Sequence, residues 1–229
     1  TVSERFNLPV YLYAEASRSQ QRIKLPDIRR GEYEGLSEKI SSPEWAPDFG
    51  PAEFNPSMGA TASGARQILI AYNVNLDTSD KAKANDIAGI IRTSGVIVRD
   101  DHGDRVLGDD GKPLRKRGMF ESLQAAGWMY NENTAQVSMN LLDHNVTGLH
   151  TVTDAIRSEA RNIGLSAVAG ELVGLVPLEA MTSAGRHYHD TPDLVDDNAL
   201  VESAINGLML DALGEFDAES SIIEWAIGI

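Results

Sequence analysis

Strand and helix patterns alternate through the middle of the chain, and their order constrains the fold more than any other feature. The first pattern, Gln67–Leu76, alternates apolar residues with Ala71, Asn73 and Asn75, as expected for a strand that buries one face. The patterns that follow are a helix from a Thr78/Ser79 cap to Arg92, strands at Ser122–Tyr130 and Ala135–Leu142, a helix at Thr151–Asn162 that Gly164 stops, and a strand at Ser166–Val176. This order is typical of a ferredoxin-like split βαβ sheet, so the sequence predicts an α+β fold, an α/β sandwich.

The segments outside this run are shorter. Pro9–Glu15 predicts a strand with apolar residues on both sides, and Arg29–Lys39 predicts a short helix. Val96–Arg117 is rich in Gly and Asp, which indicates a flexible loop or a hairpin. Thr191–Pro192 precedes a predicted helix at Asn198–Leu210, and Gly214 is expected to end it.

A long loop, Pro47–Arg66, leads into the first strand of the predicted sheet. It carries Pro47, Gly50, Pro51 and Pro56 within ten residues. Proline fixes φ and glycine permits close backbone approach, so this loop has a defined shape. Such a loop suits ligand binding, but a rigid connector between domains has the same composition.

Composition excludes several classes of protein. The net charge is −14, which argues against nucleic-acid binding because phosphates require a basic surface. The chain has no cysteine and no apolar run of the length that a membrane helix needs; we therefore expect a cytoplasmic protein without membrane partners. An anionic ligand would need local cations, and the candidates are Arg29, Arg30, Arg66 and the solvated cluster Lys112, Arg115, Lys116 and Arg117.

Amide and hydroxyl side chains alternate with apolar residues on two of the predicted strands. Asn73 and Asn75 lie on the first, and Gln136, Ser138 and Asn140 on another. A one-sided antiparallel sheet turns its polar residues to solvent. Asn is depleted in strands, however, and amides carry donors and acceptors that suit a ligand, so the sequence leaves both interpretations open.

The histidines give no clear catalytic pattern. His187 and His189 have alternating spacing and would form a two-ligand metal pair on a strand, but no third ligand accompanies them. His150 stands at a predicted helix start, where it could cap the helix or act as a general base. No phosphate loop, dinucleotide fingerprint or nucleophile elbow occurs in the chain.

Several longer segments resemble, in order, those of the formiminotransferase family. The segments are Pro9-Val-Tyr-Leu-Tyr13, Trp45-Ala-Pro-Asp-Phe-Gly-Pro51, Gly64-Ala-Arg66, Ala71-Tyr-Asn-Val-Asn-Leu76, Ala135-Gln-Val-Ser-Met-Asn-Leu141, Val146-Thr-Gly-Leu-His-Thr151 and Leu172-Val-Gly-Leu-Val-Pro-Leu178. The resemblance implies two α/β subdomains with a folate tunnel between them. Residues 1–67 would be the end of the first, and residues 68–229 the second.

The resemblance also implies a folate-binding segment, with Met58 where the family commonly has an aromatic residue. Its residues are Gly50, Pro51, Ala52, Glu53, Phe54, Asn55, Pro56, Ser57, Met58 and Gly59. The family's catalytic histidine lies in a His-Pro-Arg setting that is not found here, so we expect it upstream of Thr1 and assign no catalytic residue. On this interpretation the isolated chain is an inactive fragment, and the neighbours of the Pro9–Glu15 strand also precede Thr1.

The implied reaction is transfer of the formimino group of N-formimino-L-glutamate to tetrahydrofolate in histidine degradation. It yields 5-formiminotetrahydrofolate and glutamate, with tetrahydrofolate as co-substrate and no metal. We expect a homodimer that binds these small molecules. Two alternatives remain open: formyl transfer from N-formylglutamate, and a non-catalytic protein that binds folate or a partner.

Overall fold

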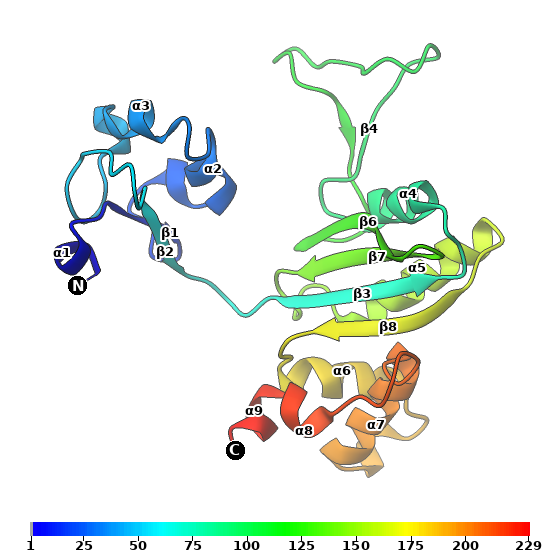
Figure 1. Cartoon of the computed structure of the whole chain (residues 1–229). Coiled ribbons are helices and arrows are strands. Elements are labelled where there is room, and N and C mark those ends of the chain that lie inside the picture. Colours follow the sequence, from blue (N-terminus) through cyan, green and yellow to red (C-terminus); the bar gives the residue numbers. More distant parts are fainter. Residues whose placement is uncertain (1) are drawn as a thin grey trace. The chain divides into compact units, whose positions relative to one another are not determined.

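The computed structural model describes residues 2–229. They form two compact units, one that ends at Gln67 and one that spans Ile68–Ile229 (Figure 1). Helices and open sheets occur together, which confirms the predicted α+β class. None of the helices in residues 2–229 is both long and apolar enough to cross a membrane.

The first unit is built around a small parallel sheet. Its elements are α1 (Val2–Phe6), β1 (Val10–Ala14), η1 (Gln20–Arg22), α2 (Leu25–Arg29), α3 (Leu36–Ile40), η2 (Pro43–Trp45) and β2 (Thr61–Ala65). β1 pairs in parallel with β2, with Val10 opposite Thr61. The expectation that β1 takes its neighbours from residues before Thr1 is therefore wrong for this edge. The sequence did not reveal β2 because its small residues lack the bulky side chains that mark a strand.

The predicted helix Arg29–Lys39 is also wrong. The chain forms two shorter helices, α2 and α3, separated by a turn in which Gly31 has φ 88° and Glu32 has φ 48°. These left-handed conformations interrupt the α-helical backbone.

The second unit contains the predicted split βαβ sheet. Its four strands lie in the order β6-β7-β3-β8, and all neighbours are antiparallel. The elements are β3 (Ile70–Leu76), α4 (Lys81–Ile91), β6 (Leu123–Asn131), β7 (Thr134–Leu141), α5 (Leu149–Asn162) and β8 (Ala167–Val173). The cap of α4 differs from the prediction, because Asp80 accepts from the Ala82 N–H at 2.9 Å.

The core of this unit lies between the sheet and the helices α4 and α5 (Figure 1). Tyr72 and Val74 of β3 and Val137 of β7 pack there against Ile87 of α4 and Ile156 of α5, all almost completely buried. Because strand side chains alternate, the residues between them face the other side of the sheet.

The remaining elements flank this sheet. Val96–Arg117 forms a long hairpin in which β4 (Val96–Ile97) pairs with β5 (Arg115–Lys116). Of the two structures that the sequence allowed, a flexible loop or a hairpin, the hairpin is therefore the one that forms. The last part of the chain is helical, with α6 (Leu178–Tyr188), η3 (Pro192–Leu194), α7 (Asp197–Leu208), α8 (Ala218–Ser221) and α9 (Ile223–Ala226). Met209, with φ 60°, closes α7 before Gly214 is reached, so the predicted stop is wrong.

Candidate functional site

The first anchor of the loop that carries Gly50–Gly59 is a buried ion pair. The Asp48 carboxylate accepts from the Leu12 N–H at 2.7 Å and from the Arg22 guanidinium at 3.1 Å. Both side chains are less than 10% exposed, at 9% for Arg22 and 3% for Asp48. Phe49 and Val10 exchange two backbone hydrogen bonds, which fix the start of the loop against β1.

A compact turn forms the middle of the Gly50–Gly59 segment. The Asn55 side-chain oxygen accepts from the Ser57 N–H, the Ser57 hydroxyl and the Met58 N–H at 2.9 to 3.1 Å. The Gly59 N–H donates to the Asn55 carbonyl at 2.7 Å. These bonds make the turn a rigid unit, as the proline and glycine content predicted.

Tyr33 fastens this turn to the body of the first unit. Its hydroxyl donates to the Pro56 carbonyl at 2.5 Å, and its ring lies 5.4 Å from the ring of Phe54. A pocket of about 210 Å³ lies beside the turn, where Tyr33, Met58 and Gly59 form part of its wall. The remaining wall residues include the aromatic side chains of Tyr11 and Trp45.

Gly50 opens the segment in a conformation that only glycine adopts easily. Its φ is 87°, and a Cβ there would lie 2.4 Å from the Leu8 carbonyl oxygen. Most of the residues from Gly50 to Gly59 are exposed, while Gly59 is buried. The structure thus presents this segment on the surface of the first unit.

The second candidate surface is the side of the four-stranded sheet that faces away from α4 and α5, here called the polar face. Strand pairing arranges its side chains in three rows. The rows are Trp128, Gln136, Asn75 and Ala169; Ala126, Ser138, Asn73 and Glu171; and Gln124, Asn140, Ala71 and Val173. Asn73, Asn75, Gln136, Ser138 and Asn140 therefore share one surface. The fold brings together all five amide and hydroxyl side chains that the sequence singled out.

These amides are more buried than a solvent-facing strand would leave them. Asn73 is 8% exposed, Asn75 is 2% exposed and Gln136 is 6% exposed. Asn73 donates to the Glu171 carboxylate at 2.9 Å. The side-chain oxygens of Asn75 and Gln136 are buried and have no hydrogen-bond partner. The simple interpretation of a solvated polar side is therefore wrong for these three residues.

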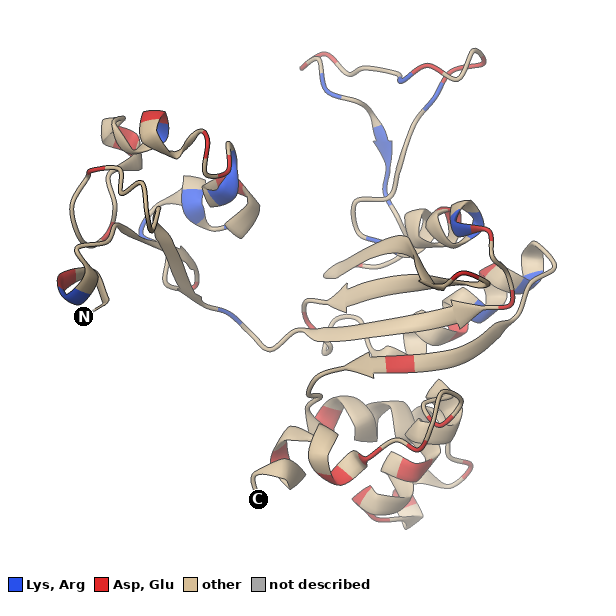
Figure 2. Ribbon diagram, in the orientation of Figure 1, with Lys and Arg blue, Asp and Glu red and all other residues tan. Residues whose placement is uncertain are grey.

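Two residues of the polar face, Glu171 and Trp128, were not predicted as candidate site residues from the sequence. Glu171 is the only charged residue in the four strands, which are otherwise free of Lys, Arg, Asp and Glu (Figure 2). Trp128 lies opposite Gln136 and is 59% exposed. Their places depend on strand register, for which the sequence of a single strand gives no signal.

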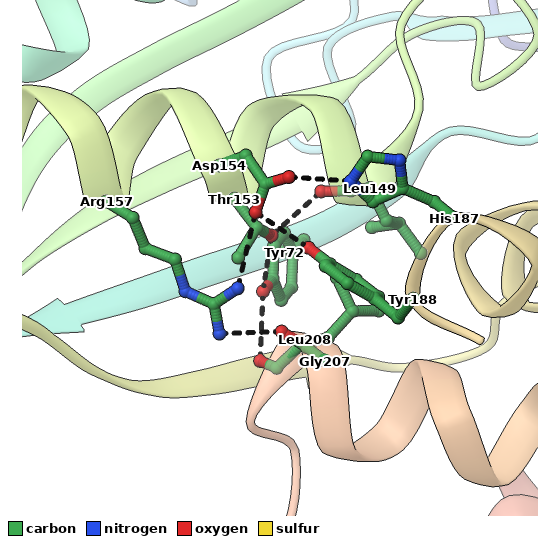
Figure 3. Close-up of polar contacts among 9 residues, drawn as sticks. All are labelled: Tyr72, Leu149, Thr153, Asp154, Arg157, His187, Tyr188, Gly207 and Leu208. Carbon is green, nitrogen blue, oxygen red and sulfur yellow. Dashed lines mark hydrogen bonds and ion pairs between the residues drawn. The ribbon is translucent and has the colours of Figure 1, made fainter. Parts of the chain in front are cut away.

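A polar network joins β3, α5, α6 and α7 on the opposite side of the sheet (Figure 3). Asp154 is its centre: it lies 2.7 Å from His187 Nε2, accepts from the Tyr188 hydroxyl at 3.1 Å and pairs with Arg157 at 3.3 Å. Arg157 also donates to the Gly207 carbonyl at 2.7 Å. The network therefore ties α5 to the ends of α6 and α7.

The environment shifts several pKa values in this network. Burial alone would raise the pKa of Asp154, but the hydrogen bonds with His187, Tyr188 and Arg157 outweigh it and lower that pKa. Burial raises the pKa of Tyr188, and the Asp154 charge raises it further. Burial lowers the pKa of His150, and so does His187, whose ring stacks 4.7 Å away. These shifts favour the neutral form of His150 and the ionised form of Asp154.

The structure does not support a His187/His189 metal pair on a strand or a capping role for His150. His187 lies in α6 and His189 just beyond it, not on a strand, and His189 Nδ1 accepts from the Thr191 N–H. Within residues 2–229, no group of three or more His, Asp or Glu side chains is arranged to hold a metal ion. His150 does not cap α5, whose N-cap is Gly148.

Most of the candidate cations are paired with nearby acids. Arg30 lies 2.7 Å from Asp27, and Arg29 lies 3.4 Å from Glu32. In the hairpin region, Arg117 pairs with Glu121 at 2.5 Å, Lys112 pairs with Asp110 at 3.4 Å, and Arg115 donates to the Ser94 carbonyl. These arginines and Lys112 are thus exposed cations that already have an acidic or carbonyl partner at the surface.

Comparison with known proteins connects both units to one family. The formiminotransferase domain matches residues 71–228, and the N-terminal subdomain of the formiminotransferase domain matches residues 1–66. The chain belongs to the formiminotransferase family. The two matches are consecutive and together cover almost the whole chain, including the segment Gly50–Gly59 and the polar face.

Named relatives of the formiminotransferase family show the extent of the match. The chain is 42% identical over 229 residues to formimidoyltransferase-cyclodeaminase of Mus musculus, covering 99% of this chain and 39% of the relative. It is 32% identical over 211 residues to glutamate formimidoyltransferase of Streptococcus pyogenes, covering 90% and 63%. For glutamate formimidoyltransferase of Thermoplasma acidophilum the identity is 36% over 189 residues, covering 82% and 55%. The chain thus spans less than two thirds of each of these relatives.

Proposed function

We propose that this chain is the folate-binding part of a glutamate formimidoyltransferase. The observation that carries the proposal is the pair of consecutive family matches, which cover residues 1–66 and 71–228. Relatives with 32% and 36% identity are named for this activity. The substrates would be tetrahydrofolate and N-formimino-L-glutamate. We further propose a cytoplasmic homodimer as the working form.

The chemistry of this reaction defines what the protein must do. The N5 amine of tetrahydrofolate attacks the formimino carbon and forms a tetrahedral intermediate. The bond from that carbon to the glutamate nitrogen then breaks; N5 loses a proton and the leaving nitrogen gains one. Catalysis therefore requires one acid/base group and close alignment of the two substrates. We assign the alignment to this chain and no catalytic residue to it.

The segment Gly50–Gly59 is the proposed folate contact. A preformed turn lowers the entropy cost of binding, because the segment does not have to be ordered by the ligand. The Asn55 hydrogen bonds and the Tyr33 clamp supply that order. The aromatic side chain of Phe54 and the apolar side chain of Met58 offer surface for a flat ring. The polar face is the proposed second binding element.

Titration of folinic acid against the full-length protein tests the folate contact. Phe54→Asp places a charge on the apolar part of the segment, at a cost of about 2 kcal/mol or more. We expect the dissociation constant to rise about thirtyfold. Leu194→Asp is the matched control, because Leu194 is 82% exposed in the second unit. Equal affinities for wild type and Phe54→Asp would contradict the placement of folate at Gly50–Gly59.

Turnover with two donors tests the reaction itself. Formiminoglutamate-dependent formation of 5,10-methenyltetrahydrofolate after acid cyclisation is the readout for formimino transfer. N-formylglutamate in its place tests formyl transfer. Binding of folinic acid without turnover of either donor would identify a non-catalytic folate-binding protein and refute the proposed transferase.

A further inference from the structure

Two buried hydrogen-bond acceptors without partners lie side by side on β3 and β7, the two inner strands of the polar face. Asn75 and Gln136 are directly opposite each other in the β3–β7 register. Each has a buried side-chain oxygen that makes no hydrogen bond. A buried polar atom without a partner is unfavourable, and native proteins contain few of them. Two in one pair indicate a group that arrives from outside the fold.

The surroundings of the pair restrict what that group can be. Trp128 of β6 lies beside Gln136, and Ala169 of β8 lies beside Asn75 at the other end of the row. Glu171, in the neighbouring row, is the only charge that the four strands carry. The Lys81 ammonium lies over the Trp128 ring, 5.0 Å from its centre. Neutral acceptors next to the Glu171 carboxylate favour a ligand with N–H donors on a planar group.

The backbone of β3 is irregular next to Asn75. The pairing of β3 with β8 shifts register between Asn75 and Leu76. Such bulges are frequent beside binding sites, where they redirect a side chain. The partner strand on the other side keeps its regular register with Asn75.

We propose that Asn75 and Gln136 form an acceptor pair that receives the N–H groups of a planar substrate group, with Trp128 beside them. This proposal rests on the proposed function, which offers two sources of such N–H groups. One is the aminopyrimidinone edge of the reduced folate, and the other is the formimino group of the donor. Each is flat and carries N–H donors that the acceptor pair would satisfy.

Isosteric apolar variants of the full-length protein test the proposal. Asn75→Leu and Gln136→Met remove the acceptors and keep most of the volume. Because no hydrogen bond within the fold is lost, we expect the urea midpoint to stay the same or to rise. We expect affinity for folinic acid, or 1/KM for formiminoglutamate, to fall about tenfold or more. Which of the two falls identifies the source of the N–H groups.

Two further variants make the result decisive. Gln136→Glu keeps an acceptor oxygen and has no amide N–H, so it should retain binding within about threefold if the oxygen is the contact. Val137→Ala, on the core side of the same strand, should lower the urea midpoint and leave the ligand parameters unchanged. Wild-type ligand parameters in both apolar variants, or losses no larger than Val137→Ala shows, would overturn the proposal. Wild type without folinic acid binding and without turnover would instead refute the proposed function.

Discussion

The environment of His150 opposes protonation of its ring. Its ring stacks on His187, and its Nδ1 is buried without a hydrogen-bond partner. Asp154 acts in the opposite direction, but burial and His187 prevail and the pKa of His150 is lowered. Arg157 and Tyr188 are also part of this environment through their contacts with Asp154. Protonation of His150 is therefore less favourable in the folded chain than in the unfolded chain.

The sign of the pH effect follows from linkage. In the unfolded chain His150 has its ordinary pKa of about 6.5, whereas the folded pKa is lower. The unfolded state consequently binds more protons below that pH, and the free energy of unfolding decreases as pH falls from 6.5 towards the folded pKa. Asp154, with its lowered pKa, loses its own stabilising contribution only at more acidic pH.

We predict that His150→Phe reduces the loss of stability between pH 7.5 and pH 5. Phenylalanine keeps a flat ring against His187 and cannot take up a proton. The measurement is the free energy of urea unfolding at the two pH values for wild type and variant. His102→Phe is the control, because His102 is exposed in the hairpin. Identical pH dependence in wild type and His150→Phe would contradict the assignment to His150.

At the scale of elements, the turn that contains Asn55 depends on a residue far away in sequence. Tyr33 reaches it from the segment between α2 and α3 and holds the Pro56 carbonyl. Asn55 supplies the internal bonds, and Tyr33 supplies the only side-chain hydrogen bond from outside the turn among the described residues. A change at Tyr33 should therefore loosen the turn without altering its sequence.

We predict that Tyr33→Phe weakens folinic acid binding about five- to tenfold. Loss of one hydrogen bond corresponds to about 1 kcal/mol, and the Phe ring still packs on Phe54. Amide hydrogen exchange at Ser57, Met58 and Gly59 should become faster. Tyr130→Phe is the matched control, since its hydroxyl is exposed and has no hydrogen-bond partner within residues 2–229. Faster exchange with unchanged affinity would show that the order of the turn does not matter for folate.

The elements that the sequence predicted well are those with strong periodicity and large side chains. The strands around Val74 and Val137 and the helix around Ile156 were found because their apolar residues repeat with a clear period. β2 and α6 were missed: β2 consists of small residues, and the His187/His189 spacing in and after α6 imitated a strand. Local patterns report on how a segment buries its own residues. β2 buries almost none, and α6 buries mostly small residues beside Met181.

The candidate surfaces were predictable only in part. Their residue types were visible in sequence, including the amides of β3 and β7 and the prolines of the loop. Their partners were not, because Glu171 reaches Asn73 through strand register and Tyr33 reaches Pro56 through the packing of the first unit. Long-range contacts of this kind depend on the whole fold. The placement of folate at Gly50–Gly59 stays a prediction.

At the scale of the whole molecule, the two units differ greatly in their hydrophobic cores. Among the described residues, the buried apolar side chains of the first unit are Leu8, Val10, Tyr11 and Ile40, and the other buried apolar side chains all belong to the second unit. Apolar burial is the main source of stability, at about 25 cal/mol per Å². The first unit relies more on polar anchors, of which the Arg22–Asp48 pair is the most buried.

We therefore predict that the first unit opens well below the free energy at which the second unit unfolds. Amide hydrogen exchange on the 229-residue chain, analysed at low urea, should show fast exchange at Val10–Ala14 and slow exchange at Ile70–Leu76. Asp48→Asn weakens the buried ion pair and should speed exchange in the first strand alone. Val74→Ala creates a cavity in the second unit. It should lower the opening free energy of Ile70–Leu76 by about 1–3 kcal/mol and so speed exchange there. Equal protection of the two strands, with each variant affecting both, would show instead that the chain unfolds as a single cooperative unit.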